Sequence, residues 1–293
     1  MRSLPFFWVD AFTTRPLSGN PCAVVLDADE LSDAQMQQLA REMNLSETAF
    51  VQKSDQADFK ARYFTPEEEI PLAGHPTISI MHVLDEVGRI SPSNPVRLEL
   101  TAGIIPIEFR RETGAPTLIT MTQLKPKFMR SYSLPELAPL FGLHDSDFLP
   151  GLALQTVSTG TAFLMVPLRD HAALKKVDIS ARAFREFRAG ADFTTPHFFC
   201  LGGATPEGQT YARHPGLPPE TLEDPFTGSA TGCMAAYLWC YGLIQEPRFI
   251  AEQGHGMGRP GSAQVEVLGA RDDIQGVKVS GSAVTLLRGT ITL

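Results

Sequence analysis

Two stretches of the chain share one pattern of apolar and small residues, and the pattern predicts a helix in each. The first begins at Pro71 and reads PLAGHPTISIMHVLDEVGRI, and the second begins at Pro225 and reads PFTGSATGCMAAYLWCYGLI. Moving Pro71 onto Pro225, an offset of 154 residues, also matches Gly74, Thr77, Leu84, Gly88 and Ile90 with identical residues. Both helices are apolar around most of their circumference, which is typical of a helix enclosed by other elements.

Short β-rich runs surround each helix, which indicates duplication of a whole domain. GNPCAVVL, ETAFV and ADFKARYFTP precede the first helix, and TVSTGTAFLMVPL, PHFFCLGG and TYARHP precede the second. The period is far longer than the roughly 20 to 50 residues of a solenoid repeat. We therefore predict an α+β fold of two similar halves, each a β-barrel-like sheet around a central helix. The halves are placed at 1–125 and 126–293, and whether the last strand, AVTLLRGTITL, crosses back to the first half is left open.

Local signals place the helices more closely. In LSDAQMQQLAREMN, Ser32 and Gln35 form a capping box that begins a helix reaching residue 43. The two enclosed helices are predicted near 75–87 and 229–241. Proline is tolerated in a first helical turn and glycine favours a helix end, which suits Pro76 and Gly88.

Composition and charge exclude several classes of protein. The chain of 293 residues is 43% hydrophobic and 20% charged, with a net charge of −8, which disfavours a nucleic-acid binder. No apolar run approaches the roughly 18 to 20 residues of a membrane helix, and the start lacks the apolar core of a signal peptide. The four cysteines show no CxxC spacing. Reduced, mostly buried thiols in a cytoplasmic protein fit best, with Cys22, Cys233 and Cys240 expected in the core.

Each enclosed helix is entered through a glycine, at Gly74-His75 and at Gly228-Ser229. Glycine allows a ligand to approach the backbone closely, and the first N–H groups of a helix favour an anion or a carbonyl oxygen. Two such turns are suited to a small acidic substrate. The alternative is that both glycines are merely corners where the chain packs tightly.

Three side chains near these turns can move protons. His75 lies at the first turn, Asp224 lies five residues before Ser229, and Glu47 lies between a predicted helix and an apolar strand. A carboxylate in that apolar setting is a candidate general base. Taken singly, each has an ordinary explanation: a surface carboxylate for Glu47, a helix cap for His75 and a turn former for Asp224.

Other catalytic and cofactor motifs are absent or weak. GHGMGRPG is followed by a strand pattern, whereas a dinucleotide fingerprint opens a helix. TGSATG differs from the G-x-S-x-G of a serine hydrolase, because Thr227 lies two residues before Ser229. The chain has no P-loop, and its histidines form no metal-binding motif. We therefore expect neither a cofactor nor a metal ion.

Five segments in one order carry a resemblance to a known family. GNPCAVV, NLSETAFV, PLAGHPT, EDPFTGSATG and EQGHGMGRP resemble the signature segments of the PhzF, or phenazine biosynthesis-like, isomerase family over nearly the whole chain. One departure is Gly261, where serine is more usual in the family. The resemblance implies a diaminopimelate epimerase-like fold with two similar halves, an active site between them and a homodimeric state.

The same resemblance implies roles for individual residues. Glu47 would be the catalytic acid and base, with His75 and Asp224 assisting. Gly74, Gly228, Ser229 and Gln253 would bind polar groups of the substrate. The implied activity is a cofactor-independent isomerisation that moves a proton between carbons of a small unsaturated carboxylic acid.

Two other functions compete with this hypothesis. Epimerases and racemases of this fold use a cysteine at each turn, but the corresponding positions here are Ala73 and Thr227, so two-cysteine racemisation is disfavoured. The second alternative is a non-catalytic small-molecule-binding or interaction protein on an enzyme fold. A pure binder would not need Glu47, His75 and Asp224 together, which favours an enzyme.

Overall fold

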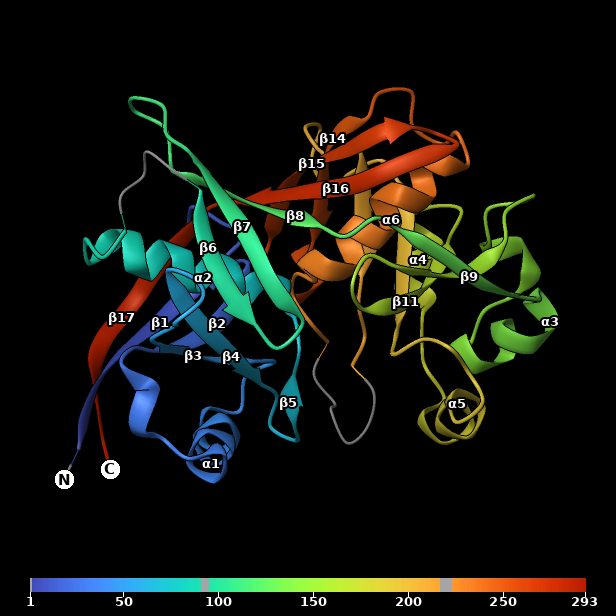
Figure 1. The fold of residues 1–293 in the computed structure, drawn as a ribbon. Helices are drawn as coiled ribbons and strands as arrows, with labels where there is room; N and C mark the ends of the chain where they lie inside the picture. The colour runs from blue at the N-terminus through green and yellow to red at the C-terminus, as the bar shows by residue number, and fades with distance from the viewer. Residues whose placement is uncertain (1, 91–94, 217–222) are drawn as a thin grey trace. The chain divides into compact units, whose positions relative to one another are not determined.

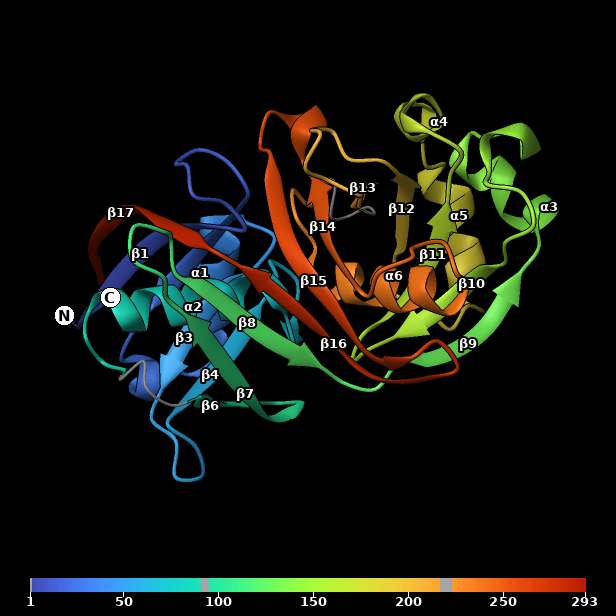
Figure 2. The same cartoon turned by 90° about the horizontal axis from the view of Figure 1, so that it is seen from above.

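The chain divides into two compact units in the computed structural model, which describes residues 2–90, 95–216 and 223–293. The first unit comprises Met1–Thr122 and Ser280–Leu293, and the second comprises Gln123–Val279. Figures 1 and 2 show the elements of both units as ribbons from two directions. The final strand therefore belongs to the first unit, although it lies at the far end of the sequence.

The first unit is a curved sheet with three helical segments. Its strands are β1 (Ser3–Ala11), β2 (Asn20–Val25), β3 (Thr48–Gln52), β4 (Phe59–Phe64), β5 (Glu69–Ile70), β6 (Val96–Leu100), β7 (Gly103–Arg110), β8 (Leu118–Gln123) and β17 (Ala283–Thr292). Its helices are the 3-10 turn η1 (Ala28–Glu30), α1 (Asp33–Met43) and α2 (Gly74–Glu86). The pairing runs β17–β1–β2–β3–β4–β6–β7–β8, and the pairs β2–β3 and β4–β6 are parallel.

The second unit repeats this arrangement and contains additional helices. Its strands are β9 (Lys127–Tyr132), β10 (Leu154–Ser158), β11 (Ala162–Pro167), β12 (Pro196–Leu201), β13 (Thr210–Arg213), β14 (Arg248–Gln253), β15 (Gly261–Ala270) and β16 (Asp273–Gly281). Its helices are α3 (Leu134–Leu137), η2 (Ala138–Phe141), η3 (Asp145–Asp147), α4 (His171–Lys176), α5 (Ala181–Arg188), α6 (Gly228–Cys240) and η4 (His255–Met257). The pairing runs β9–β10–β11–β12–β13–β14–β15, with β11–β12 and β13–β14 parallel.

The strand order shows which segments of the two units correspond. In both units a parallel pair, an antiparallel pair and a second parallel pair follow one another, so β2, β3, β4 and β6 match β11, β12, β13 and β14. In the chain, helix α2 comes between β4 and β6, and helix α6 comes between the corresponding strands β13 and β14. The α+β fold with two similar halves is therefore the observed one.

Both central helices are buried along most of their length, as their apolar sequences predict. Ten residues of α2 and ten of α6 are buried, so the helices pack inside their own units rather than on a surface. Each helix ends with the same hydrogen bonds around a left-handed glycine, Gly88 with φ 72° and Gly242 with φ 71°. The capping box of Ser32 and Gln35 at the start of α1 is also confirmed.

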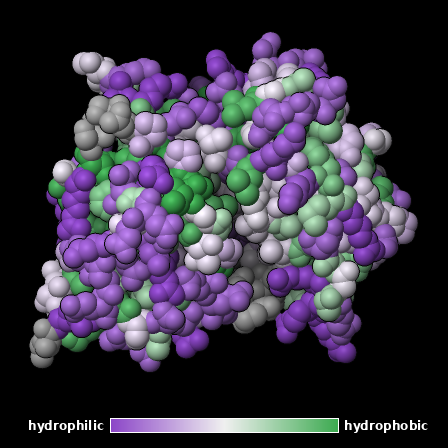
Figure 3. Space-filling model, viewed as in Figure 1, coloured by the Kyte–Doolittle hydropathy of each residue, from purple (hydrophilic) through white to green (hydrophobic). Residues whose placement is uncertain are grey.

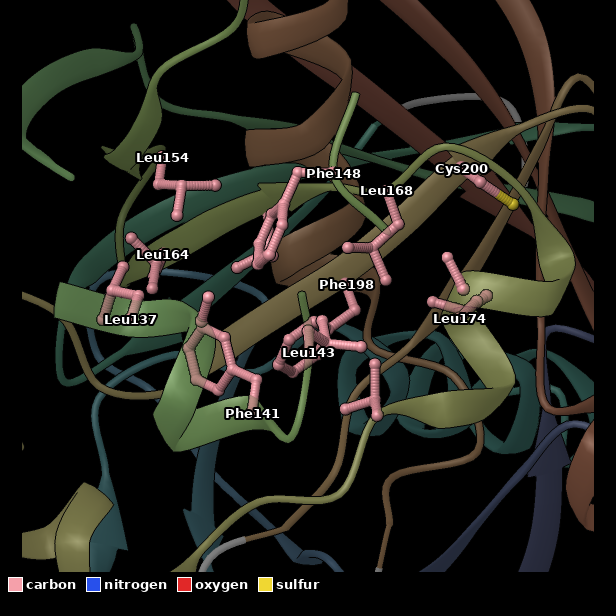
Figure 4. Packing of buried hydrophobic residues seen from close by; sticks show 14 of the residues in the cluster. Leu137, Phe141, Leu143, Phe148, Leu154, Leu164, Leu168, Leu174, Phe198 and Cys200 are labelled. Atoms are coloured by element: carbon pink, nitrogen blue, oxygen red, sulfur yellow. The ribbon is translucent and has the colours of Figure 1, made fainter. Parts of the chain in front are cut away.

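Each unit contains an apolar cluster made of its own residues. In the first, α1 packs its Met36, Leu39 and Ala40 against Phe50 and Phe64, whose rings meet edge to face at 5.5 Å. In the second, Figure 4 shows Phe141 and Phe198 among the buried leucines of the cluster. The rings of Phe141 and Phe198 also meet edge to face, at 4.8 Å.

The surface drawn in Figure 3 is mostly polar, and the cysteines form no disulfide. Hydrophilic side chains cover most of the face drawn in Figure 3, with hydrophobic residues scattered between them. Within the described part of the chain, no helix combines the length and the apolar character needed to cross a membrane. All four cysteines are free, and Cys22 and Cys233 are buried as expected. Cys200 is buried as well. The expectation for Cys240 is wrong: it is exposed, because the last turn of α6 emerges from the core.

Candidate functional site

In the first unit, the loop before β3 and the start of α2 bring Glu47 next to His75. Asn44 ends α1 in a left-handed conformation, and Glu47 is the residue immediately before β3. His75 is the second residue of α2. An Oε2 atom of Glu47 lies 3.2 Å from Nδ1 of His75. Two residues that are 28 positions apart thus form one carboxylate–imidazole pair.

Burial differs between the two members of this pair. The His75 side chain is 3% exposed, whereas that of Glu47 is 19% exposed. The carboxylate therefore remains accessible, while the imidazole is enclosed behind it. A partly accessible carboxylate beside a fixed polar group is a suitable arrangement for proton transfer to and from a ligand.

Asn20, the first residue of β2, completes the surroundings of the imidazole. Its Nδ2 atom lies 3.0 Å from Nδ1 of His75, and Asn20 is itself fully buried. Asn20 belongs to the segment GNPCAVV, which was recognised as a motif, but no role was predicted for this side chain. The sequence does not show that β2 passes beside the start of α2.

The electrostatic setting keeps His75 neutral. Burial lowers the pKa of His75 to about 3, and a hydrogen bond with the backbone of Pro21 opposes that effect only in part. Its Nδ1 side is occupied by Asn20 and Glu47, whereas its Nε2 has no hydrogen-bond partner among the described residues. A buried polar atom without a partner is unfavourable, so Nε2 is suited to a hydrogen bond with a ligand.

A thiol lies close to the same carboxylate. Burial raises the pKa of Cys22 strongly, and the Glu47 carboxylate raises it further. Cys22 is 0% exposed and therefore stays a neutral thiol near Glu47. This agrees with the prediction that Cys22 belongs to the core.

The start of α2 offers its backbone N–H groups without a side-chain cap. The N-cap residue is Ala73, which has no polar side chain, and Gly74 and His75 follow it. The hydroxyl of Thr77 donates to the carbonyl of Ala73 over 2.7 Å, which fixes the first turn. Neither Gly74 nor Gly228 has a positive φ, so the two turns need no left-handed glycine. An uncapped helix start of this kind favours an anionic group.

In the second unit, Asp224 is held by a small hydrogen-bonded network. The Thr227 hydroxyl donates to Oδ2 of Asp224 over 2.5 Å. The Gln253 amide donates to the Asp224 carbonyl over 2.6 Å and accepts from the Thr227 N–H over 3.2 Å. Gln253 is buried, with 1% exposure. These two hydrogen bonds hold the segment that carries Asp224.

The start of α6 matches the start of α2. Its N-cap residue, Thr227, provides no side-chain cap, and Gly228 and Ser229 are the first two helical residues. Gly228 is buried and Ser229 is half-buried. The amide of Gln123 donates to the carbonyl of Gly228 over 2.9 Å, which anchors the beginning of the helix.

Each unit therefore gathers its own part of the predicted site. Glu47, His75 and Gly74 lie together in the first unit, and Asp224, Gly228, Ser229 and Gln253 lie together in the second. The roles given to these seven residues, including substrate contact by Gln253, stay predictions. Residues 2–90, 95–216 and 223–293 contain no group of three or more metal-ligating side chains.

Comparison with known proteins gives a consistent result over the whole length. Residues 9–289 match the family model described as phenazine biosynthesis-like protein. An uncharacterized isomerase of Bacillus subtilis is 34% identical and covers 94% of each chain. A trans-2,3-dihydro-3-hydroxyanthranilate isomerase of Pseudomonas chlororaphis is 36% identical. The match covers 97% of this chain and 98% of that relative's chain.

Solved structures agree with the sequences. A PhzF-family phenazine biosynthesis protein of Bacillus anthracis superimposes with a TM-score of 0.89 at 30% identity over all of both chains. A hydroxyproline epimerase of Agrobacterium vitis, at 15% identity and a TM-score of 0.69, shares the fold. This chain belongs to the phenazine biosynthesis-like, or PhzF, family and is an isomerase.

Proposed function

We propose that this isomerase moves a proton between two carbons of a small unsaturated carboxylic acid, with Glu47 as the acid and base. The observation that carries the proposal is the pair formed by the accessible Glu47 carboxylate and the buried, neutral His75. One carboxylate can remove the proton and return it when both carbons present the same face to it. The compound in the name of the Pseudomonas relatives, trans-2,3-dihydro-3-hydroxyanthranilate, is the first substrate to test.

His75 and Asp224 are proposed to adjust the protonation of substrate heteroatoms while the double bonds shift. The Nε2 atom of His75 is available for this purpose, since the described residues leave it without a partner. Asp224 is held through Oδ2 by Thr227, which fixes the direction of its carboxylate. Fixed groups of this kind assist catalysis because they do not have to reorganise when charge develops.

The uncapped helix starts are proposed to bind the substrate carboxylate or an enolate-like oxygen. The N–H groups near Gly74 and Gly228 lack side-chain caps, which supports this assignment. The resemblance to the family also supports Ser229 and Gln253 as substrate contacts. No cofactor enters the proposed mechanism, because general acid–base chemistry alone balances the proton transfer.

The experiment compares Glu47→Gln with the wild-type protein in D₂O. Glutamine keeps the shape of the side chain but cannot accept the proton, so kcat should fall at least about 100-fold while KM changes little. Deuterium arriving at the receiving carbon, followed by NMR, measures the transfer directly.

A matched control separates this effect from a general loss of charge. Glu42 lies on α1 and is exposed, so Glu42→Gln should retain wild-type kcat. If Glu47→Gln turns over at the wild-type rate on the true substrate, Glu47 is not the base and the proposed mechanism fails.

Homodimer formation and a cytoplasmic location are proposed on the basis of the family resemblance. The four free thiols support a reducing compartment, where disulfides rarely persist. Light scattering at micromolar concentration tests the oligomeric state, and a monomeric mass would contradict the proposal. Fractionation of the producing cells tests the location.

A further inference from the structure

A buried pair of histidines lies beside Asp224 in the second unit. Nε2 of His214 lies 2.9 Å from the hydroxyl of Thr195, and Nδ1 of His214 lies 3.2 Å from Nδ1 of His197. The two rings are 5.4 Å apart between centroids. His214 is 6% exposed and His197 is fully buried. Both ring nitrogens of His214 are therefore engaged, which fixes the orientation of its ring.

The backbone places His214 directly opposite Asp224. These two residues form an antiparallel bridge, and the N–H of Asp224 donates to the carbonyl of His214 over 2.9 Å. Residues opposite each other in an antiparallel pair project their side chains to the same side. The Asp224 carboxylate and the His214 imidazole are thus neighbours on one face.

The other groups around His214 are identified by the same geometry. Phe163 of β11 packs edge-on against the ring at 5.5 Å between centroids. Arg213 precedes His214 and so projects to the opposite face, where its guanidinium forms a bidentate pair with Glu223. Among the described residues, the titratable groups recorded around this ring are His197, which contacts it, and Asp224, whose charge acts on it.

Electrostatics couple His214 to Asp224. Burial lowers the pKa of His214 to about 4, and the negative charge of Asp224 acts in the opposite direction. Burial lowers the pKa of His197 well below its ordinary value, and His214 adds to that effect. Both rings are therefore neutral near pH 7. The Asp224 charge is therefore close enough to act on the His214 ring.

The pairing of the matched strands β2–β3 and β11–β12 shows which residue of the second unit corresponds to Glu47. In the first unit, Ala23 lies four residues after Gly19 and pairs with Thr48, the residue that directly follows Glu47. Four residues after Gly160, Leu164 pairs with Pro196, which directly follows Thr195. Thr195 therefore occupies the position that corresponds to Glu47, and the second unit supplies its carboxylate from the turn instead.

We propose that His214, held by Thr195 and His197, is a positioning residue for Asp224. Each unit then contains one carboxylate–histidine pair, Glu47 with His75 and Asp224 with His214. The proposal rests on the proposed function, since it takes Asp224 to exchange a proton with the substrate. His214 does not itself touch the substrate; it holds the Asp224 segment in place through the backbone bridge and packs its fixed ring on the face where the Asp224 carboxylate lies.

A kinetic experiment separates positioning from packing. His214→Phe keeps an aromatic ring against Phe163 but removes both polar contacts, so kcat should fall at least about tenfold while KM stays within about twofold. His214→Gln restores a polar group near Thr195 and should recover part of kcat. His171→Phe is the matched control, because His171 lies on α4 and stacks on Tyr211, and it should keep the wild-type kcat. Wild-type kcat in His214→Phe would overturn the proposal.

A second measurement does not depend on activity or on the substrate. Histidine ring nitrogens labelled with ¹⁵N are titrated in the folded wild-type protein and in Asp224→Asn. Loss of the negative charge should lower the pH at which His214 takes up its proton by about one unit, the low end of the effect of a nearby opposite charge. His82, on α2 of the other unit, should titrate identically in both proteins. An unchanged titration of His214 would overturn the coupling.

The outcomes also distinguish this inference from the proposed function. If Glu47→Gln abolishes deuterium transfer while His214→Phe behaves as wild type, only the role of His214 is wrong. If Glu47→Gln is fully active, the proposed mechanism fails, whereas the ¹⁵N titration still decides whether His214 is coupled to Asp224. If His214→Phe does not fold, as judged by circular dichroism, His214→Gln and the Asp224→Asn titration decide the question.

Discussion

The starts of α2 and α6 share one framework and differ in the chemistry that it presents. In both, a threonine hydroxyl one turn into the helix donates to the N-cap carbonyl, Thr77 to Ala73 over 2.7 Å and Thr231 to Thr227 over 2.9 Å. The second helical residue is His75 in one and Ser229 in the other. The framework has thus been kept in both units, while the groups able to move protons have diverged.

A second shared feature lies just before each helix. Arg62 binds Glu69 through two hydrogen bonds of 2.8 and 2.6 Å, and Arg213 binds Glu223 through two of 2.9 and 2.7 Å. Glu69 and Glu223 are related by the same 154-residue offset as the two helices. Each pair fixes the chain shortly before it enters the helix. The arginine–glutamate pair is thus present in both units, whereas the histidine at the helix start is present in the first unit alone.

Acid should destabilise the protein because neutral histidines are buried in both units. The pKa is about 3 for His75 and about 4 for His214 in the folded protein, against about 6.5 when unfolded. Between these values the unfolded chain binds more protons, so stability is fully present above pH 6.5 and falls as the pH decreases. Each such histidine contributes up to about 1.4 kcal/mol per pH unit. Urea unfolding at pH 7, 6 and 5 measures the loss.

Replacing the two buried histidines of the second unit tests how much of this pH dependence they cause. The double variant His197→Phe/His214→Phe should show a shallower decrease of unfolding free energy between pH 7 and 5 than the wild type, while His75 still contributes. An equal slope in both proteins would mean that the pair in the second unit does not take up protons on unfolding.

Removing the arginine of each pair should affect the second unit more. Arg213 also donates to the carbonyls of Leu174 and Val177, whereas the further contacts of Arg62 are the exposed Asp33 and the ring of Phe64. We expect Arg213→Met to lower the free energy of unfolding by about 2 to 3 kcal/mol and Arg62→Met by about 1 to 2 kcal/mol, since unpaired, partly buried groups remain. Urea denaturation of both variants at pH 7 measures the difference, and the reverse order would contradict this account.

The two threonines should give the smallest effects, and in the opposite order. Thr77 also lies 2.7 Å from the hydroxyl of Tyr63, which is buried, whereas the described contact of Thr231 is the helix carbonyl alone. Thr77→Val should cost about 1 to 2 kcal/mol because the Tyr63 hydroxyl loses a partner, and Thr231→Val about 0.5 to 1 kcal/mol. Thermal unfolding monitored by circular dichroism would show the order, and equal losses would argue against a contribution from Tyr63.

Helix positions were predictable because they depend on local patterns. The capping box at Ser32 was read from four consecutive residues, and the central helices were found within one residue of their observed limits. The exposure of Cys240 was not predictable, since an apolar helix does not show in its sequence which end leaves the core. The pairing of Arg62 with Glu69 was missed for another reason: it joins β4 to β5, and an ion pair between two strands has no fixed spacing in the sequence.

Local propensity and a repeat of identical residues were enough to predict the duplication, the two enclosed helices and the candidate residues at their entrances. Three contacts could be known from the folded chain alone: Asn20 lies against His75, Gln253 holds the Asp224 segment and His214 faces Asp224. Those contacts join different strands and loops, from 10 to 55 positions apart in the chain. Their geometry depends on which strands pair and in which register, and a one-residue change of register would turn each side chain to the opposite face.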